Sequence, residues 1–484
     1  MNILLLNPPG LHSFSRDYFC SKVTKTGYIE HPVDLLLLSG ILSEKHQVSF
    51  IDSILDNSTP CELKRQISGD NFDAIIFLSG TSSFPDDSRF LKNLKCHSPN
   101  LILVGIGDVF RDEKVFRSNE WLDAVILDFT NRDIMAFLEN DFDSIKNMFF
   151  RGNGTIFVRK TAIPKHSVFE IPVPRHDLFI NSRYLFPFSR FHPYATVLTD
   201  FGCPFNCAFC IYCTLGFKLR PIENVVEELR FLKSLKIREI FFKDQAFGAD
   251  KNRTFELCKT MTEIGGFSWS CFMRADCISP DLLKAMKIAG CHTIMFGVES
   301  ANEAILERFH KNITKEKVRY AFSCCKDEKI DRLGIFILGF PDESEKSVRQ
   351  TIKFAFELDC DFVSFNVFMP KPETPARKWI EKQLPDLGWE NETLDQSGFL
   401  PFKSYSKVSS SCLETLKNWA ILRFYFRPTY FLRRIRKAQT SFELKMLFMM
   451  GFSMFFSILE QVVQKITVSC NIPQLDAFRK NLKP

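Results

Sequence analysis

The sequence predicts an α/β protein with two successive parallel sheets and a helical carboxyl-terminal region. Short, fully apolar runs alternate with helix-like segments through most of the chain, which is typical of strands buried on both faces of a parallel sheet. A proline-rich stretch divides the alternation into two series, and aromatic and basic segments follow the second. We therefore expect a doubly wound domain (1–150), a linker (151–190), an incomplete barrel (191–385) and a helical region (386–484).

Composition and charge narrow the class of protein. Hydrophobic residues make up 45% and charged residues 25% of the 484 residues, which is typical of a globular chain and excludes wholesale disorder. The formal charge of +6 is small for this length, so we expect no nucleic-acid partner. The opening apolar run is short, no basic residue precedes it, and no apolar run is long enough to span a bilayer. We therefore expect a cytoplasmic protein.

The first series predicts the doubly wound sheet. Strands are expected over 1–9, 46–53, 72–80, 100–108 and 122–129, with a helix over 33–46. Ligands of such sheets bind at the carboxyl ends of the strands. Small or polar residues stand at three of these ends: Asn7, Pro8, Ser79, Thr81, Gly105 and Gly107. They are candidates for contact with a cofactor, and ordinary turns between strand and helix are the alternative.

The linker and the second series come next. A basic, hairpin-like piece (151–160) leads into a proline-rich extended stretch. Six βα repeats follow, with strands expected over 195–201, 238–244, 268–276, 292–300, 332–340 and 361–370. Six repeats at this spacing favour an incomplete (β/α) barrel, in which loops at the carboxyl ends of the strands carry the chemistry.

The last hundred residues differ from the rest. An aromatic and basic segment (422–437) precedes fourteen uncharged residues from Met446 to Leu459, a run too short for a comfortable membrane span. A helical cap packed on the barrel is the simpler interpretation. The alternative is a surface that touches a membrane or receives a lipid-like substrate, with four cations near lipid headgroups: Arg433, Arg434, Arg436 and Lys437.

Four of the sixteen cysteines lie close together, directly after the first barrel strand. Cys203, Cys207 and Cys210 form a C-x3-C-x2-C pattern, and Cys213 follows. Three thiolates on one loop can ligate three corners of a cubane iron–sulfur cluster and leave the fourth iron open. A zinc site that includes Cys213 is an alternative, because structural zinc needs four ligands. A ferredoxin-like electron carrier is another.

The segment CPFNCAFC resembles the cluster loop of the radical S-adenosylmethionine (radical SAM) superfamily. The resemblance implies that Cys203, Cys207 and Cys210 hold a [4Fe–4S] cluster whose open iron chelates S-adenosylmethionine. It further implies reductive cleavage of that cofactor to a 5′-deoxyadenosyl radical, which abstracts hydrogen from carbon. Phe209 matches the family's aromatic position, and Cys213 lies outside the pattern.

The later barrel strands extend this resemblance in order. Their carboxyl ends match family segments that surround S-adenosylmethionine, and the matching residues are Asp244, Arg274, Glu299, Ser300, Gly339 and Pro341. Taken singly, each has another interpretation. Asp244 could be a helix cap, Arg274 could form an internal salt bridge, and Glu299 could belong to a solvated turn.

The amino-terminal half resembles the cobalamin-binding subclass of the same superfamily. The resemblance covers roughly residues 1–385 and implies a Rossmann-like, cobalamin-binding-type domain before a partial (β/α)6 TIM-type radical SAM barrel. The candidate residues at the first three strand ends would then contact cobalamin. Two features depart from the pattern. No D-x-H-x-x-G motif occurs, so we expect no histidine ligand to cobalt, and Ile106 adds bulk between Gly105 and Gly107.

The resemblance predicts an oxygen-sensitive radical SAM enzyme. The resemblance favours a cobalamin-dependent C-methyltransferase. The aromatic and basic tail suggests a small-molecule or lipid-like substrate, from lipid or secondary-metabolite biosynthesis. The resemblance also implies an electron donor such as flavodoxin or ferredoxin. The catalytic residues stay unassigned. A non-methylating radical reaction, such as a cyclisation, rearrangement or C–C bond formation, is the first alternative, and a non-enzymatic zinc-binding protein is the second.

Overall fold

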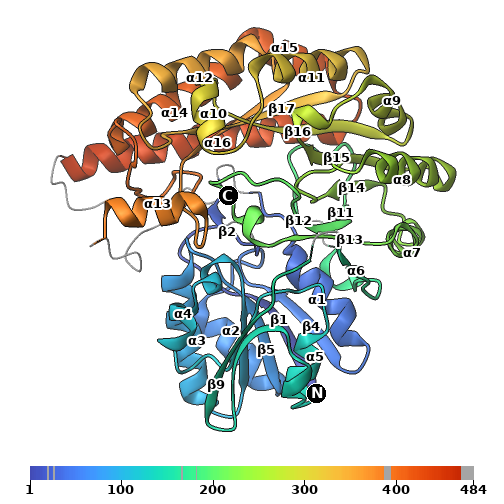
Figure 1. Cartoon of the computed structure of the whole chain (residues 1–484), viewed down its shortest axis with the longest axis vertical. Coiled ribbons are helices and arrows are strands. Elements are labelled where there is room, and N and C mark those ends of the chain that lie inside the picture. The colour runs from blue at the N-terminus through green and yellow to red at the C-terminus, as the bar shows by residue number, and fades with distance from the viewer. Residues whose placement is uncertain (19–20, 25–27, 165–166, 181–182, 386–393, 470–484) are drawn as a thin grey trace.

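The protein has two α/β domains, with helices added to the second (Figure 1). The computed structural model describes residues 1–18, 21–24, 28–164, 167–180, 183–385 and 394–469. In Figure 1 the amino-terminal domain, in blue and cyan, lies below the barrel, in green to orange. The two parallel sheets and the carboxyl-terminal helices confirm the predicted fold class.

The amino-terminal domain is built on a seven-stranded sheet of order β4-β1-β5-β6-β7-β8-β9. Its strands are β1 (Asn2–Asn7), β4 (Gln47–Asp52), β5 (Ala74–Leu78), β6 (Ile102–Ile106), β7 (Ala124–Ile126), β8 (Asn147–Gly152) and β9 (Thr155–Lys160). The first five are parallel, as their fully apolar runs predict. The hairpin β8–β9 adds antiparallel strands at one edge, so this sheet continues to Lys160, beyond the boundary expected at residue 150.

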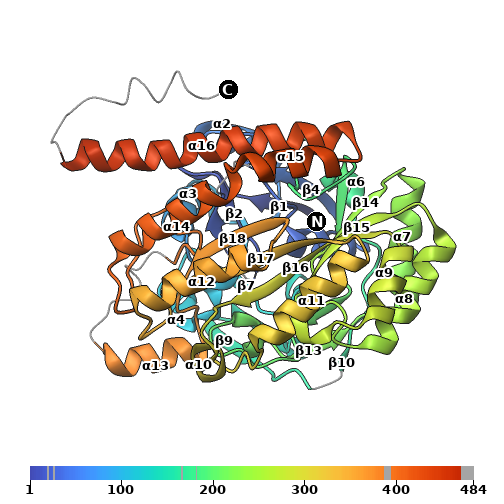
Figure 2. The same ribbon diagram turned by 90° about the horizontal axis from the view of Figure 1, so that it is seen from above.

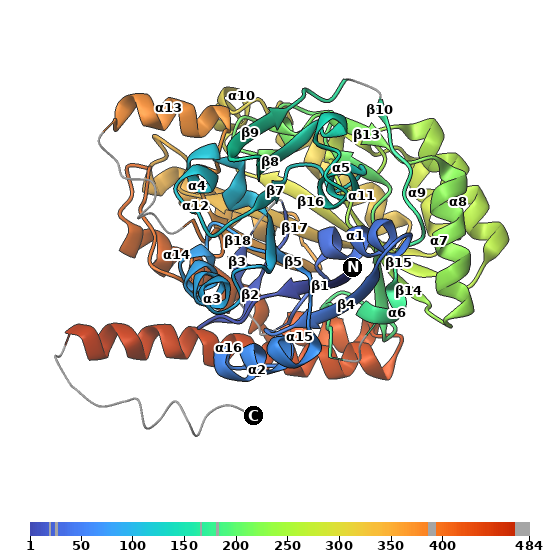
Figure 3. The same ribbon diagram turned by 90° about the horizontal axis from the view of Figure 1, so that it is seen from below.

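Helices cover both faces of this sheet (Figure 3). They are α1 (Val33–Ser43), α2 (Pro60–Asp70), α3 (Phe84–His97), α4 (Glu113–Arg117) and α5 (Asp133–Leu138). Helix α1 is apolar on nearly all sides, because one side packs on the sheet and the other meets the linker. A Cβ on Gly40 would overlap the backbone of Pro172 and Val173, so glycine allows this close contact.

A short hairpin covers the carboxyl ends of the amino-terminal strands. It consists of β2 (Phe14–Ser15) and β3 (Lys22–Val23). Between them, the fully buried Arg16 pairs with Asp87 at 2.6 Å between Nη2 and Oδ1 and donates to the side-chain oxygen of Asn7. The hairpin is therefore fixed to the edge where a doubly wound sheet binds its ligands.

The second domain is an incomplete barrel of six parallel strands in sequential order, as predicted. The strands are β11 (Tyr194–Val197), β14 (Glu239–Phe242), β15 (Ser268–Met273), β16 (Cys291–Glu299), β17 (Asp331–Leu338) and β18 (Phe362–Val367). Its outer helices are α7 (Ile222–Ser234), α8 (Lys251–Ile264), α9 (Pro280–Ile288), α10 (Glu303–Arg308), α11 (Lys315–Asp327) and α12 (Glu345–Glu357). A small sheet beside the barrel joins β10 (Ser167–Val168), β13 (Phe217–Leu219) and β12 (Asp200–Gly202).

The linker fills part of the barrel interior. After α6 (His176–Phe179), Tyr184 and Phe186 enter a cluster with Phe241, Met295 and Leu333 of the barrel strands. The rings of Phe186 and Phe241 stack with centroids 4.2 Å apart. The linker is therefore part of the barrel core.

Buried ion pairs join the two domains. The Nζ of Lys218 lies 2.6 Å from the Oδ2 of Asp128, and that of Lys371 lies 3.1 Å from the Oδ2 of Asp108. Lys243, at the end of β14, bridges two acids of the amino-terminal domain. Each pair places an amino-terminal carboxylate against a lysine of the second half. Because a buried charge is costly without its partner, these pairs fix how the domains meet.

The described residues after the barrel form helices α13 (Pro375–Gln383), α14 (Ser410–Tyr425), α15 (Pro428–Lys437) and α16 (Ser441–Ser469). Helix α14 packs on β18, and α16 runs along one side of the molecule next to α15 (Figure 2). The cations of α15 mostly bind the barrel. Arg434 and Lys437 pair with Asp331, and Arg433 pairs with Asp359. Three of the four cations assigned to lipid headgroups are thus engaged by carboxylates, and Arg436 is exposed.

Candidate active site

The cysteine loop begins at the end of β12 and lies between the two domains (Figure 1). Gly202 has φ +86°, and a Cβ there would overlap the carbonyl oxygen of Gly216. The backbone nitrogen of Cys203 donates to that same carbonyl over 3.2 Å. The paired strands β12 and β13 therefore fix the start of the loop, and glycine is needed where they approach most closely.

The three thiols of the C-x3-C-x2-C pattern converge. Burial raises the pKa of Cys203 to about 12 and that of Cys210 well above its usual value, and the neighbouring thiols raise both further. Burial and the charge of Cys207 raise the pKa of Cys213 to about 11. Positive charge or a bound metal would favour the thiolates over the thiols. Within the described residues, no group of three or more His, Cys, Asp or Glu is arranged to hold one metal ion.

Two cations lie against these thiols. The Nη1 of Arg274 lies 3.5 Å from the Sγ of Cys207, and its guanidinium covers the ring of Phe205 at 3.9 Å. Arg274 also pairs with Asp276, so the interpretation as an internal salt bridge holds alongside its contact with the loop. Lys311 is buried nearby. Burial alone would lower the pKa of its ammonium, but Glu299 and Cys207 raise it.

Glu299 points toward the same place because the end of β16 is irregular. The register with β17 shifts between Gly297 and Glu299, and Glu299 has φ +66°. Its Oε1 lies 3.1 Å from the Nζ of Lys311. A Cβ on Gly297 would overlap this carboxylate, so the glycine leaves room for it. Glu299 is buried in an ion pair and does not belong to a solvated turn.

The next residue, Ser300, turns away into the protein. Its hydroxyl lies 3.2 Å from the hydroxyl of Thr351 and accepts from the backbone nitrogen of Asn302. These bonds hold the start of the loop after β16. The structure therefore brings Glu299, but not the side chain of Ser300, to the cysteine loop.

Asp244 holds the turn before the cysteine loop. Its Oδ1 accepts from the backbone nitrogens of Thr199 and Asp200 at 2.6 and 3.0 Å, and its Oδ2 accepts from the hydroxyl of Thr199. It is not a helix cap, because Asp250 caps α8. Burial raises the pKa of Asp200 well above its usual value, and the charge of Asp244 adds to this effect. Asp244 therefore positions the entry to the loop.

The turn after β17 packs on the aromatic residue of the cysteine loop. Gly339 has φ +85°, and its nitrogen donates to Oε2 of Glu343 over 2.8 Å. The next ring, Phe340, lies 5.4 Å from Phe209 between centroids. Pro341 is buried after it. The two segments that matched the family's motifs thus meet through Phe209 and Phe340.

The candidate cobalamin residues lie at the carboxyl edge of the amino-terminal sheet, but the domain itself engages them. Asn7 donates to Asp52, and Ser79 donates to Asp87. Gly105 packs under the ring of Phe110, and Gly107 meets the carbonyl of Ser79. Pro8 is buried. The half-buried Thr81 donates to Asp108 over 3.0 Å. These glycines are therefore explained by internal packing.

The same edge nevertheless holds buried polar atoms without partners. Within the described residues, the hydroxyl oxygens of Thr24, Ser53 and Ser82 form no hydrogen bond. Ser53 follows β4, Ser82 follows β5, and Thr24 follows the covering hairpin. An unpaired buried hydroxyl costs about 1–3 kcal/mol. The edge therefore fits a polar group of a ligand, contacted by hydroxyls that the sequence did not single out.

Sequence reasoning also missed three residues of the barrel site. Lys311 follows a helix, away from any strand end, so nothing in its sequence context signals a buried cation. Asp200 sits beside the strand end that carries the cysteines and could have been found there. Glu343 lies three residues after Phe340, and the pattern around it is typical of the start of the next helix, so it did not indicate a site residue.

Comparison with known proteins finds a matching family model and relatives over most of the chain. The family model described as the radical SAM superfamily matches residues 198–355. An uncharacterized methyltransferase of Pyrococcus horikoshii, PH0819, is 30% identical over 90% of this chain and 95% of its own length. Bacteriochlorophyllide d C-12(1)-methyltransferase of Chlorobaculum tepidum is 24% identical over 76% of this chain and 78% of its own.

Two solved structures share the overall fold. The cobalamin-dependent S-adenosylmethionine radical enzyme OxsB, solved with aqua-cobalamin and S-adenosylmethionine, superposes with a TM-score of 0.65 at 16% identity. The match covers 95% of this chain and 72% of OxsB. The radical S-adenosylmethionine methyltransferase TsrM of Kitasatospora setae gives 0.64 at 15% identity, over 80% of this chain and 78% of TsrM.

Proposed function

The chain belongs to the radical SAM superfamily, and on this premise we propose that it is a cobalamin-dependent methyltransferase. It is an enzyme with the two-domain architecture of the cobalamin-binding subclass. The methyltransferase names of two relatives support methyl transfer as the reaction. Its cofactors are then a [4Fe–4S] cluster, S-adenosylmethionine and cobalamin, and a flavodoxin or ferredoxin supplies the electron.

One observation carries this proposal: three converging thiols on one loop with two buried cations beside them. Cys203, Cys207 and Cys210 are the ligands that would hold the cluster, and Arg274 and Lys311 stabilise their thiolates. When bound, the cluster supplies the electron that cleaves S-adenosylmethionine to a radical able to abstract hydrogen from carbon. Glu299 compensates the charge of Lys311 and holds it in place.

The proposed cobalamin site is the carboxyl edge of the amino-terminal sheet, which faces the barrel. The unpaired hydroxyls of Thr24 and Ser82 support a polar ligand there. Cobalamin held at this edge would supply the methyl group, and the substrate would lie between the domains. We further propose a hydrophobic substrate from lipid or secondary metabolism. The non-methylating radical reaction stays the alternative.

Two measurements separate methyl transfer from the alternative. Anaerobically prepared enzyme, reduced in the presence of S-adenosylmethionine, should release 5′-deoxyadenosine. Adding cobalamin and candidate hydrophobic acceptors should yield a product in which a methyl group replaces a hydrogen, together with S-adenosylhomocysteine, because S-adenosylmethionine would methylate the cobalamin. Release of 5′-deoxyadenosine without methylated product, under conditions where cobalamin is bound, would favour the non-methylating reaction.

A substitution tests the cobalamin site itself. Thr81→Trp places a large side chain at the half-buried edge, so cobalamin binding measured by equilibrium dialysis should fall about tenfold or more. Arg89→Trp, on the exposed side of α3, is the matched control and should bind normally. Equal cobalamin binding by both variants would exclude this edge as the site.

A further inference from the structure

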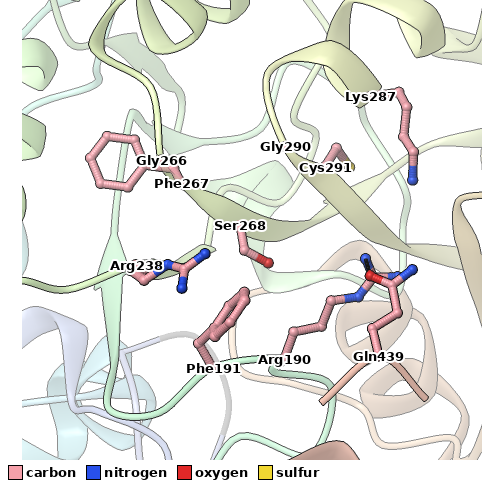
Figure 4. Close-up of a pocket in the computed structure, with 10 residues that line it drawn as sticks. All are labelled: Arg190, Phe191, Arg238, Gly266, Phe267, Ser268, Lys287, Gly290, Cys291 and Gln439. Atoms are coloured by element: carbon pink, nitrogen blue, oxygen red, sulfur yellow. Dashed lines mark hydrogen bonds between the residues drawn. The ribbon is translucent and has the colours of Figure 1, made fainter.

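A basic cavity lies at the end of the barrel opposite the cysteine loop. It has a volume of about 250 Å³ and is lined by residues at the amino-terminal ends of β15 and β16 (Figure 4). Figure 4 shows the side chains of Arg190, Arg238 and Lys287 around one opening, with Ser268 between them. No part of the proposed catalytic site uses these residues.

Positive charge exceeds negative charge in this cavity. Arg190 donates to Gln439, and its Nε lies 3.8 Å from the Oε1 of Glu443. Arg238 stacks on Phe191 at 3.9 Å and has no ion pair within the described part of the chain. Burial lowers the pKa of Lys287, and the charge of Arg190 lowers it further. Of the described residues, three cations and no carboxylate line the cavity, so it favours an anionic ligand.

An apolar cavity of about 710 Å³ adjoins the basic one. Its walls come from β18 and from helices α14, α15 and α16, with Phe362, Tyr425 and Met446 among them. The linker and the connection between α15 and α16 contribute to both cavities. Ser189 and Ala438 line the apolar cavity, and their neighbours Arg190 and Gln439 line the basic one. An anion in the first cavity and an apolar chain in the second would therefore lie side by side.

Helix α16 lies along the protein and exposes an apolar face. Within the described part of the chain, only its segment Ser441–Leu459 is long and apolar enough to cross a membrane. Met446 and Ile458 are buried in the protein core, and twelve residues of helix separate them by about 18 Å. The opposite face is exposed, with Phe452 65% accessible, and consists of Phe448, Met449, Phe452, Phe455, Phe456 and Leu459. This geometry fits a helix lying in a membrane surface.

The charge around this face is positive. Glu443 is the single carboxylate between Pro428 and Leu459, and it caps the start of α16. Arg436 and Lys445 are exposed on the same two helices, next to Leu432 and Ile435 of α15. An apolar face bordered by cations complements an anionic bilayer, whose negative surface potential attracts each cation.

We propose that this end of the barrel docks on an anionic phospholipid membrane. The exposed face of α16 enters the headgroup layer. A lipid phosphate binds between Arg190, Arg238 and Lys287, and an acyl chain of that lipid occupies the apolar cavity. The proposal is independent of the cluster and of methyl transfer, and it leaves the cysteine loop facing away from the membrane.

Vesicle sedimentation of the full chain tests the apolar face. The protein should pellet with vesicles of phosphatidylglycerol and phosphatidylcholine and remain largely in solution with phosphatidylcholine alone. The double substitution Phe452→Ser and Phe456→Ser should weaken pelleting about tenfold or more. Phe255→Ser, at an exposed phenylalanine on α8, is the control and should pellet like the unaltered chain.

A second pair of variants tests the headgroup cavity. Lys287→Gln combined with Arg238→Gln should reduce pelleting with the anionic vesicles, whereas Lys284→Gln, on the exposed side of α9, should not. Circular dichroism checks that each variant is folded. If pelleting depends neither on lipid charge nor on either set of substitutions, the proposal is overturned. A dimer in analytical ultracentrifugation that Phe452→Ser dissociates, without vesicle binding, would also overturn it and assign the face to self-association.

Discussion

The guanidinium of Arg274 reaches the thiol of Cys207, with 3.5 Å between Nη1 and Sγ, and its carboxylate partner Asp276 fixes its direction. A positive charge at this distance stabilises a reduced, more negative cluster. Arg274→Gln should therefore shift the midpoint potential of the [4Fe–4S] cluster to a more negative value, as measured by redox titration with electron paramagnetic resonance. Arg274→Lys keeps a charge and should shift it less. A shift to a more positive potential would contradict this role.

Asp244 offers a test of how the cysteine loop is positioned. Its carboxylate accepts two backbone N–H groups and one hydroxyl, so Asp244→Asn places an amide donor against these donors. We expect a loss of about 1–3 kcal/mol in the free energy of unfolding by urea, and a lower iron content after reconstitution. Asp281→Asn, exposed on α9, should change neither quantity. Full iron loading of Asp244→Asn would show that the loop does not depend on this residue.

The barrel strands and the cysteine loop could be predicted from the sequence because their signals are local. Apolar runs of strand length and the C-x3-C-x2-C spacing each lie within a few residues. Lys311 could not be predicted, because its burial depends on Glu299 and Cys207, which other loops bring to it. The direction of Ser300 depends on the register shift after Gly297, a feature of strand pairing that the sequence pattern does not contain.

The partners of the α15 cations also could not be predicted from the sequence. A basic helix next to an apolar one is typical of a membrane surface, but Arg434 is buried against Asp331 at the start of β17. That carboxylate lies about a hundred residues earlier in the chain, so the pairing depends on how α15 packs on the barrel. The exposed positive charge of this region comes instead from Arg436 and Lys445.

The pair Arg434–Asp331 should contribute strongly to stability. Burial opposes ionisation of Asp331, but Arg434 and Lys437 lower its pKa to about 2. Removing one partner leaves a buried charge, so Arg434→Gln should reduce the free energy of unfolding by about 3 kcal/mol and speed hydrogen exchange in α15. Arg436→Gln, on the exposed side of the same helix, should have little effect on either.

Because the pKa of Asp331 is lowered on folding, the contribution of this ion pair to the free energy of unfolding should be present above about pH 4 and lost as the pH falls toward 2.

Asp34 predicts a pH dependence of the opposite sign. This residue of α1 is fully buried, and burial, reinforced by the charge of Asp17, raises its pKa to about 7. The folded chain therefore holds a proton that the unfolded chain has lost between about pH 4 and 7, so stability falls as the pH rises through that range. Asp34→Asn should remove this loss, raising the melting temperature at pH 8 and leaving it nearly unchanged at pH 4. Asp70→Asn, exposed at the end of α2, is the control. An equal rise in the melting temperature of Asp34→Asn at pH 4 and pH 8 would contradict the raised pKa of Asp34.

The central claim is that Cys203, Cys207 and Cys210 hold a [4Fe–4S] cluster that cleaves S-adenosylmethionine. The most direct measurement is the iron content and 5′-deoxyadenosine release of the anaerobically reconstituted chain, compared with Cys207→Ala and Cys213→Ala. The account predicts about four irons per chain and release of 5′-deoxyadenosine for the unaltered chain and for Cys213→Ala, with release abolished in Cys207→Ala. One zinc per chain with no iron, or dependence of metal binding on Cys213, would contradict it.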